Sequence, residues 1–149
     1  MTHAAPFQPC FIVPLYNHGN TLAATLAALS QFELPILVVD DGSDAATKAV
    51  LAQQVAYYPN CQALTLSRNL GKGGAVMAGM QHQFNAGFSH ALQVDADGQH
   101  NLQDIPAMLA CARQHPTALV AGVPIYDASI PKGRLYGRYI THVWVWIET

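Results

Sequence analysis

The chain has 149 residues, of which 51% are hydrophobic and only 11% charged, and its formal net charge is −2. This length suits one domain with a sizeable core, and a charged fraction below the roughly 25% of soluble domains indicates strands buried on both faces. Because the chain is weakly acidic and has no basic block, nucleic acid is not expected as a partner.

The cysteines and the N-terminus favour a reduced, cytoplasmic protein. Cys10, Cys61 and Cys111 are odd in number and form no C-x-x-C pair, so we expect buried thiols rather than disulfides or a zinc site. No charged segment followed by a long apolar run opens the chain, and no stretch reaches the roughly 18 apolar residues of a membrane span. We expect a protein that is soluble or attached peripherally to the inner face of the membrane.

Apolar runs alternate with helical patterns along most of the chain. The first run, Cys10–Val13, predicts a strand that ends at Pro14, because proline lacks the N–H that a ladder needs. Leucines at helical spacing then predict a helix over 21–31 with Asn20 as its N-cap. The later expected elements are a strand at 35–39, a helix at 45–57 capped by Ser43 or Asp44, a strand at 62–66, a loop over 67–74 followed by a helix that runs to about residue 86, a strand leading to Asp95, a helix at 103–114 and a strand at 118–123.

This alternation predicts an α/β fold with a Rossmann-like, mostly parallel sheet flanked by helices. Each polar cluster follows the carboxyl end of a strand, which is the edge where open α/β sheets bind ligands. We therefore expect one crevice to collect 16–17, 40–41, 69–72 and 95–97.

The alternation stops after residue 123. Residues 124–133 have a loop-like composition, and 134–147 predict a helix with Leu135, Tyr139, Val143 and Trp146 on one face. Such an aromatic end needs a surface to bury against. We therefore expect a single domain over 1–149 that is an N-terminal fragment truncated at the C-terminus.

The segment Leu92–His100 carries the strongest chemical signal. If the chain stays extended, Asp95 and Asp97 point to one side, where two carboxylates repel each other unless a proton or a cation lies between them. Mg²⁺ or Mn²⁺ suits such oxygen ligands, and Gln99 can add its amide oxygen. The alternative is an ordinary turn, because Asp and Gly are common loop residues.

Two further loops allow nucleotide contacts, and each has a structural alternative. The run 40–43 can form a turn and a helix cap, or its aspartate can accept a hydrogen bond from a nucleobase. The run 69–74 matches neither a P-loop nor a dinucleotide fingerprint. Its glycines and Lys72 can still cradle a diphosphate at a helix N-terminus, or form a tight turn with a solvated lysine.

Taken together and in this order, four motifs resemble the family 2 glycosyltransferases, and most of all their dolichyl-phosphate mannose synthase type. The motifs are Val13-Pro14-Leu15-Tyr16-Asn17, Val38-Val39-Asp40-Asp41-Gly42-Ser43, Asn69-Leu70-Gly71-Lys72-Gly73-Gly74-Ala75 and the DXD-containing Val94-Asp95-Ala96-Asp97-Gly98-Gln99-His100. The resemblance implies a GT-A nucleotide-sugar fold, a Mg²⁺ or Mn²⁺ ion, and transfer of a sugar with inversion from a nucleoside-diphosphate sugar to a polyprenyl phosphate, another lipid or a glycan.

The same resemblance implies a role for each motif residue. Pro14, Tyr16 and Asn17 would line the nucleoside pocket, Asp41 would meet the base, Asn69 and Lys72 would lie near the donor, Asp95 and Ala96 would touch the nucleotide, and Asp97 and Gln99 would hold the metal together with Asp95. His18 stands where the family often has a glutamate. The general base and the acceptor loop are expected beyond Thr149.

Two other classes of protein remain open. A nucleotidyltransferase shares a related sheet, but it would show a glycine-rich, basic loop after the first strand, where this chain has 15–19, Leu-Tyr-Asn-His-Gly. A non-catalytic nucleotide-sugar-binding module would need only the donor half of the site.

Overall fold

The structure is a computed structural model that describes residues 6–98 and 100–122. Contacts divide the chain into two compact units, Met1–Leu119 and Val120–Thr149. Every helix and strand assigned within the described residues belongs to the first unit. The single domain expected over 1–149 stays a prediction, and the expected helix at 134–147 lies outside the described residues.

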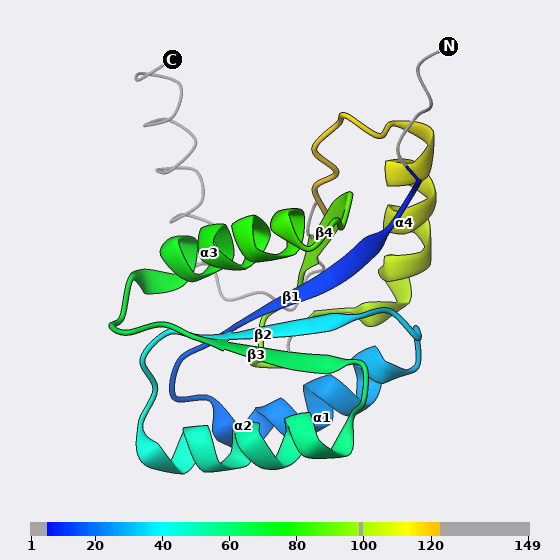
Figure 1. Cartoon of the computed structure of the whole chain (residues 1–149). Helices are drawn as coiled ribbons and strands as arrows, with labels where there is room; N and C mark the ends of the chain where they lie inside the picture. Colours follow the sequence, from blue (N-terminus) through cyan, green and yellow to red (C-terminus); the bar gives the residue numbers. More distant parts are fainter. Residues whose placement is uncertain (1–5, 99, 123–149) are drawn as a thin grey trace, which may run out of the picture. The chain divides into compact units, whose positions relative to one another are not determined.

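A four-stranded parallel sheet in the order β3-β2-β1-β4 forms the centre of the first unit (Figure 1). The elements are β1 (Pro9–Leu15), α1 (Gly19–Ser30), β2 (Ile36–Asp40), α2 (Ala45–Tyr57), β3 (Cys61–Thr65), α3 (Gly71–Asn85), β4 (His90–Gln93), a short 3-10 helix η1 (Leu102–Asp104) and α4 (Ile105–Gln114). Helices α1 and α2 cover one face of the sheet and α3 covers the other. The predicted α/β fold is confirmed.

The central strands β1 and β2 are buried on both faces, as the low charge of the chain indicates. On one face, Phe11 and Val38 pack with leucines of α1 such as Leu26. On the other face, Ile12 and Val39 pack beneath α3. The two edge strands, β3 and β4, are more exposed, and among the described residues each pairs with one strand only.

Helix α3 lies directly against the sheet at Gly79. A Cβ atom on Gly79 would lie 2.9 Å from Cγ2 of both Ile12 and Val39, closer than real Cβ contacts. A glycine at this position therefore lets the helix approach the two central strands.

Pro14 does not end the first strand, so that prediction is wrong. β1 continues to Leu15, and Pro14 lies opposite Val39 of β2. The carbonyl of Ile12 accepts from Val94 on the side of β4, and Pro14, two residues further on, faces that same side. Because the paired part of β4 ends at Gln93, opposite Ile12, the missing N–H of Pro14 breaks no ladder bond.

One of the two predicted helix caps is confirmed and the other is wrong. Asp44 caps α2, since its carboxylate accepts from the backbone N–H of Thr47 at 2.7 Å. Helix α1 begins at Gly19, with His18 rather than Asn20 in the N-cap position, and the His18 side chain makes no capping hydrogen bond. The helix begins two residues earlier than the leucine spacing predicts, because Gly19 and Asn20 add no apolar side chain to the pattern.

The strand expected at 118–123 is absent over 118–122, and Val123 lies outside the described residues. The N–H of Ala118 instead donates to the carbonyl of His115 in a turn after α4. Leu119 is 94% exposed. An apolar run forms a strand only when a neighbouring strand pairs with its backbone, and residues 118–122 have no such neighbour in the part of the chain that the structure describes.

Candidate functional site

Four loops gather at the carboxyl edge of the sheet, because the four strands are parallel. They follow β1 (16–18), β2 (41–44), β3 (66–70) and β4 (94–101, of which 99 is not described). All of the motif residues predicted for the site, apart from Pro14 inside β1 and Lys72 at the start of α3, fall in these loops. Hydrogen bonds link the first loop to the second and the second to the third, and they tie the fourth loop to helices α3 and α1.

Asn17 joins the first loop to the second. Its backbone N–H donates to Oγ of Ser43 at 3.1 Å, and its side-chain Oδ1 accepts from the N–H of Asp44 at 2.8 Å. Asn17 has a positive φ of 55°, a conformation that asparagine adopts more often than most residues. The N–H of Ser43 in turn donates to Asp40 at 2.9 Å. The predicted nucleoside residue Asn17 therefore also has a structural role.

Asp41 joins the second loop to the third. Its carboxylate is buried, and Oδ1 accepts from the backbone N–H of Leu70 at 2.6 Å. The neighbouring Gly42 has φ +79°, and a Cβ there would lie 3.0 Å from the nitrogen of Asn69. The Asn69 side chain accepts from the N–H of Gly71 at 2.9 Å, which fixes the turn into α3.

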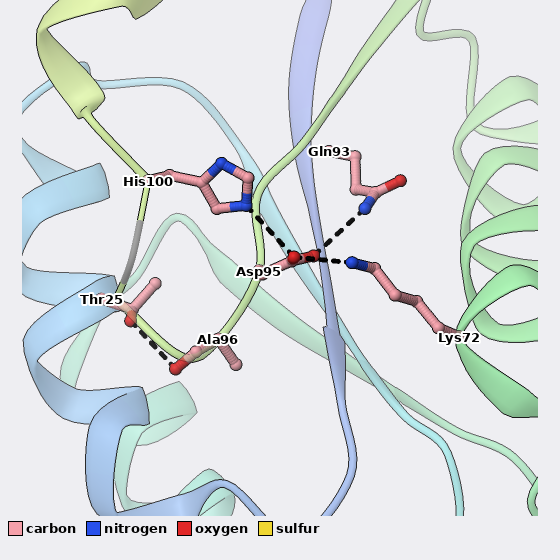
Figure 2. Close-up of polar contacts among 6 residues, drawn as sticks. All are labelled: Thr25, Lys72, Gln93, Asp95, Ala96 and His100. Atoms are coloured by element: carbon pink, nitrogen blue, oxygen red, sulfur yellow. Dashed lines mark hydrogen bonds and ion pairs between the residues drawn. The ribbon is translucent and has the colours of Figure 1, made fainter. Parts of the chain in front are cut away.

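Lys72 joins α3 to the loop after β4 through Asp95 (Figure 2). Nζ of Lys72 lies 2.6 Å from Oδ2 of Asp95, and Nε2 of His100 lies 3.2 Å from the same oxygen. Gln93 donates to Oδ1 at 3.1 Å. Partial burial raises the pKa of the Asp95 carboxyl, but hydrogen bonds from these three side chains, together with the charge of Lys72, leave the pKa below its usual value.

The loop after β4 returns to α1 through the carbonyl of Ala96. Oγ1 of Thr21 donates to this carbonyl at 2.6 Å. Oγ1 of Thr25 lies 3.3 Å from the same carbonyl, as Figure 2 shows. The chain turns at Ala96 and Asp97, so the extended conformation considered for this segment is not adopted. That Asp97 and Gln99 hold a metal with Asp95 stays a prediction, and Gln99 lies outside the described residues.

Tyr16 is an exposed aromatic side chain at the carboxyl edge of the sheet. It follows β1 directly and is 49% exposed. Its ring can stack on a flat ligand while its hydroxyl stays in water. Pro14, also predicted for the nucleoside pocket, is half-buried within β1.

Sequence reasoning missed the two threonines of α1 and Gln93 of β4. The signal for Thr25 was available, since it interrupts the apolar face that Leu22, Leu26 and Leu29 form. A hydroxyl on the buried face of a helix needs a partner. Gln93 offered no signal, because glutamine on an edge strand is ordinary.

The side chains predicted to bind a metal at this edge, Asp95, Asp97 and Gln99, would offer oxygen atoms as ligands. Over residues 6–98 and 100–122, no three His, Cys, Asp or Glu side chains are grouped closely enough to hold a metal ion by themselves. Asp95 nevertheless accepts a cation, the Lys72 ammonium. No helix among the described residues combines the length and the apolarity needed to cross a bilayer.

Known proteins match most of the chain. An undecaprenyl-phosphate mannosyltransferase of Micrococcus luteus is 30% identical over 126 residues, which are 83% of this chain and 49% of that protein. An undecaprenyl-phosphate 4-deoxy-4-formamido-L-arabinose transferase of Photorhabdus laumondii is 34% identical, over 69% of this chain and 33% of that protein. A dolichyl-phosphate beta-glucosyltransferase of Trichomonas vaginalis is 36% identical, over 63% of this chain and 31% of that protein. The chain thus spans about half the length, or less, of these curated relatives.

A solved structure has the same fold. It is a mannosyltransferase from Pyrobaculum calidifontis in complex with GDP-Man and Mn²⁺, which aligns with a TM-score of 0.57 and 21% identity over 67% of this chain and 30% of that one. This likeness confirms the GT-A type of α/β fold. The family model described as Glycosyl transferase family 2 matches residues 10–145. The four ordered motifs, the matching sheet and this family match together show that the chain belongs to glycosyl transferase family 2.

Proposed function

We propose that the chain is the donor-binding part of a metal-dependent glycosyltransferase, which moves a sugar from a nucleoside-diphosphate sugar to a polyprenyl phosphate with inversion. One observation carries the proposal: Lys72 and Asp95 meet at 2.6 Å at the carboxyl edge of the sheet, beside the N-terminus of α3. This contact places the Lys72 ammonium, which would bind a phosphate, next to the Asp95 carboxylate, which would bind a metal. The names of the relatives supply the polyprenyl-phosphate acceptor.

The start of α3 suits a diphosphate. The first N–H groups of a helix have no partner inside the helix, and the helix dipole favours an anion there. Gly71 and Gly73 lie in this first turn, and a Cβ at either would have nothing within 4 Å. A phosphate could therefore approach the backbone closely, with Lys72 beside it.

Asp95 fits a divalent metal. Its Oδ2 already accepts a cation, and two-oxygen carboxylates are the preferred ligands of Mg²⁺ and Mn²⁺. Such ions are commonly held by one or two carboxylates together with phosphate oxygens of the substrate, so Asp95 and Asp97, with Gln99, would suffice once the donor is bound. The metal would stabilise the negative charge that develops on the departing nucleoside diphosphate.

The chain's own residues would orient the donor and balance its charge. Tyr16 would stack on the nucleoside and Asp41 would accept from the base, while Asn17 and Asn69 hold the loops that carry them. Lys72 would leave Asp95 for the diphosphate and stabilise the leaving group. A phosphate acceptor is already anionic and needs no base, whereas a hydroxyl acceptor would need one from another part of the protein. A lipid acceptor would place the reaction at the cytoplasmic face of a membrane.

The test is a product assay with a panel of donors. The chain is incubated with Mn²⁺, undecaprenyl phosphate and UDP- or GDP-sugars, and the released nucleotide is identified by chromatography. Acceptor-dependent release of a nucleoside diphosphate supports the proposal. Release of pyrophosphate from a nucleotide substrate would indicate a nucleotidyltransferase instead, and donor binding without release would indicate a binding module, an alternative favoured by the half-length coverage of the relatives.

A further inference from the structure

The loop after β4 loses the support of the sheet just before its carboxylates. The strand ends at Gln93, and one more backbone bond, from Val94 to the carbonyl of Ile12 at 3.0 Å, follows it. Residues 95–97, which we call the acidic loop, come next. Contacts outside the sheet must therefore hold this loop in place.

The acidic loop is anchored at its middle residue. Val94 and Ala96 are buried in the core cluster on the α1 side of the sheet, while the Asp95 side chain remains 22% exposed. The carbonyl of Ala96 lies between the two aspartates in the chain and is directed at α1. Fixing this carbonyl therefore fixes the backbone from which both carboxylates project.

Two hydroxyls one helical turn apart converge on that carbonyl. Thr21 donates to it at 2.6 Å, and its alternative acceptor, the carbonyl of His18, lies further away at 3.2 Å. Thr25 lies 3.3 Å from the Ala96 carbonyl and 3.2 Å from the carbonyl of Thr21. A carbonyl can accept two hydrogen bonds, so Ala96 has room for both hydroxyls. The single Thr25 proton is shared between the carbonyls of Ala96 and Thr21, which lie at nearly equal distances, and Thr21 therefore makes the stronger bond to the loop.

The identity of these residues agrees with such a role. Thr25 is buried among Leu22, Leu26 and Leu29, where an apolar side chain would pack without a polar group to satisfy. Threonine also forms helices less readily than leucine or alanine. By contrast, the hydroxyl of Ser30 near the other end of α1 bonds only within the helix, to Ala27 at 2.8 Å.

We propose that Thr21 and Thr25 are positioning residues, which act through the Ala96 carbonyl to hold the acidic loop in the geometry that binds a metal and a nucleoside diphosphate. This assignment rests on the proposed function and adds two residues to its site. In this role each threonine acts on the donor site only through the backbone of the acidic loop. Loss of their hydroxyls lets the loop move, so the part of the nucleotide affinity that depends on metal falls, while stacking and base contacts remain.

The test compares valine and serine at these positions by isothermal titration calorimetry. GDP and UDP are each titrated into the chain with and without Mn²⁺. Thr21→Val and Thr25→Val keep the branched shape and remove the hydroxyl, Thr21→Ser and Thr25→Ser keep the hydroxyl, and Ser30→Ala removes a hydroxyl from the same helix away from the loop. In each valine variant we expect the gain in nucleotide affinity that Mn²⁺ provides to be about tenfold smaller than in the wild-type chain. The serine variants and Ser30→Ala should keep the full gain.

The outcomes separate positioning from general stability. Thermal unfolding is followed for every variant, and Thr21, which is half-buried, provides a variant that should fold even if Thr25→Val does not. Valine variants that keep the Mn²⁺-dependent affinity, or that weaken binding equally with and without Mn²⁺, would overturn the proposal. A wild-type chain that binds neither nucleotide with Mn²⁺ would overturn the proposed function itself, which is a different result.

Discussion

Replacing Gly79 by alanine should destabilise the fold, although the same change at Gly73 of the same helix should not. A Cβ at Gly79 would lie 2.9 Å from Cγ2 of Ile12 and of Val39, two buried residues with restricted side chains. Gly73, in the first turn of the same helix, has nothing within 4 Å of such a Cβ and provides the matched control. Alanine favours a helix over glycine by up to about 1 kcal/mol at either position.

Because both variants gain this helix propensity, the difference between their free energies of unfolding measures the cost of overpacking at Gly79. Extra carbon in a packed core costs about 1–3 kcal/mol, so Gly79→Ala should be less stable than Gly73→Ala by that amount. The free energy of unfolding is measured by urea titration followed by circular dichroism. Equal stabilities, within about 0.5 kcal/mol, would show that α3 does not press on the sheet at this point.

Three further predictions concern charge and reactivity. Lys72→Met should weaken the binding of a nucleoside diphosphate about tenfold, as expected for a lost charge-assisted hydrogen bond, and unchanged affinity in calorimetry would contradict the role of the lysine. The pKa of Asp95 is lowered in the folded chain, so the ionised carboxylate stabilises the fold. This contribution is complete above the unfolded pKa of about 3.9 and is lost as the pH falls through the folded pKa. Urea titration at several pH values should therefore show a smaller loss of stability in acid for Lys72→Met than for the wild-type chain. Burial raises the pKa of the Cys10 and Cys61 thiols to about 11, so in a colorimetric disulfide-exchange assay near neutral pH only the exposed Cys111 should react quickly. Two or three fast thiols would argue against the burial of β1 and β3.

The helices that lie between clear apolar runs were predicted well. The helix expected at 45–57 is α2 with the same bounds, and the helix expected at 103–114 ends where α4 ends. The parallel sheet followed from the alternation of strand and helix, which leaves few other topologies. Pro14 and the run 118–122 were predicted wrongly, because the effect of a proline or an apolar run depends on which strand lies beside it. That is a property of the tertiary structure.

The candidate site was predicted as a set of residues but not as a set of contacts. Sequence placed Lys72 and Asp95 at the same edge, yet their 2.6 Å contact depends on where α3 crosses the sheet. It also assigned Asn17 and Asp41 to the nucleotide, whereas their side-chain oxygens bind backbone N–H groups of neighbouring loops. An aspartate or asparagine after a strand can serve a ligand, a loop or both, and residue type alone does not distinguish these roles. The anchoring of Ala96 involves backbone atoms and was invisible to motif analysis.

The central claim is that acidic side chains of the loop after β4 bind a metal together with a nucleoside diphosphate. Its most direct test is calorimetric titration of the wild-type chain and of Asp97→Ala with GDP and with UDP, each in the presence and in the absence of Mn²⁺. The account predicts that Mn²⁺ strengthens the binding of one nucleotide to the wild-type chain and that Asp97→Ala abolishes this gain. An Mn²⁺-dependent affinity that survives in Asp97→Ala would contradict it.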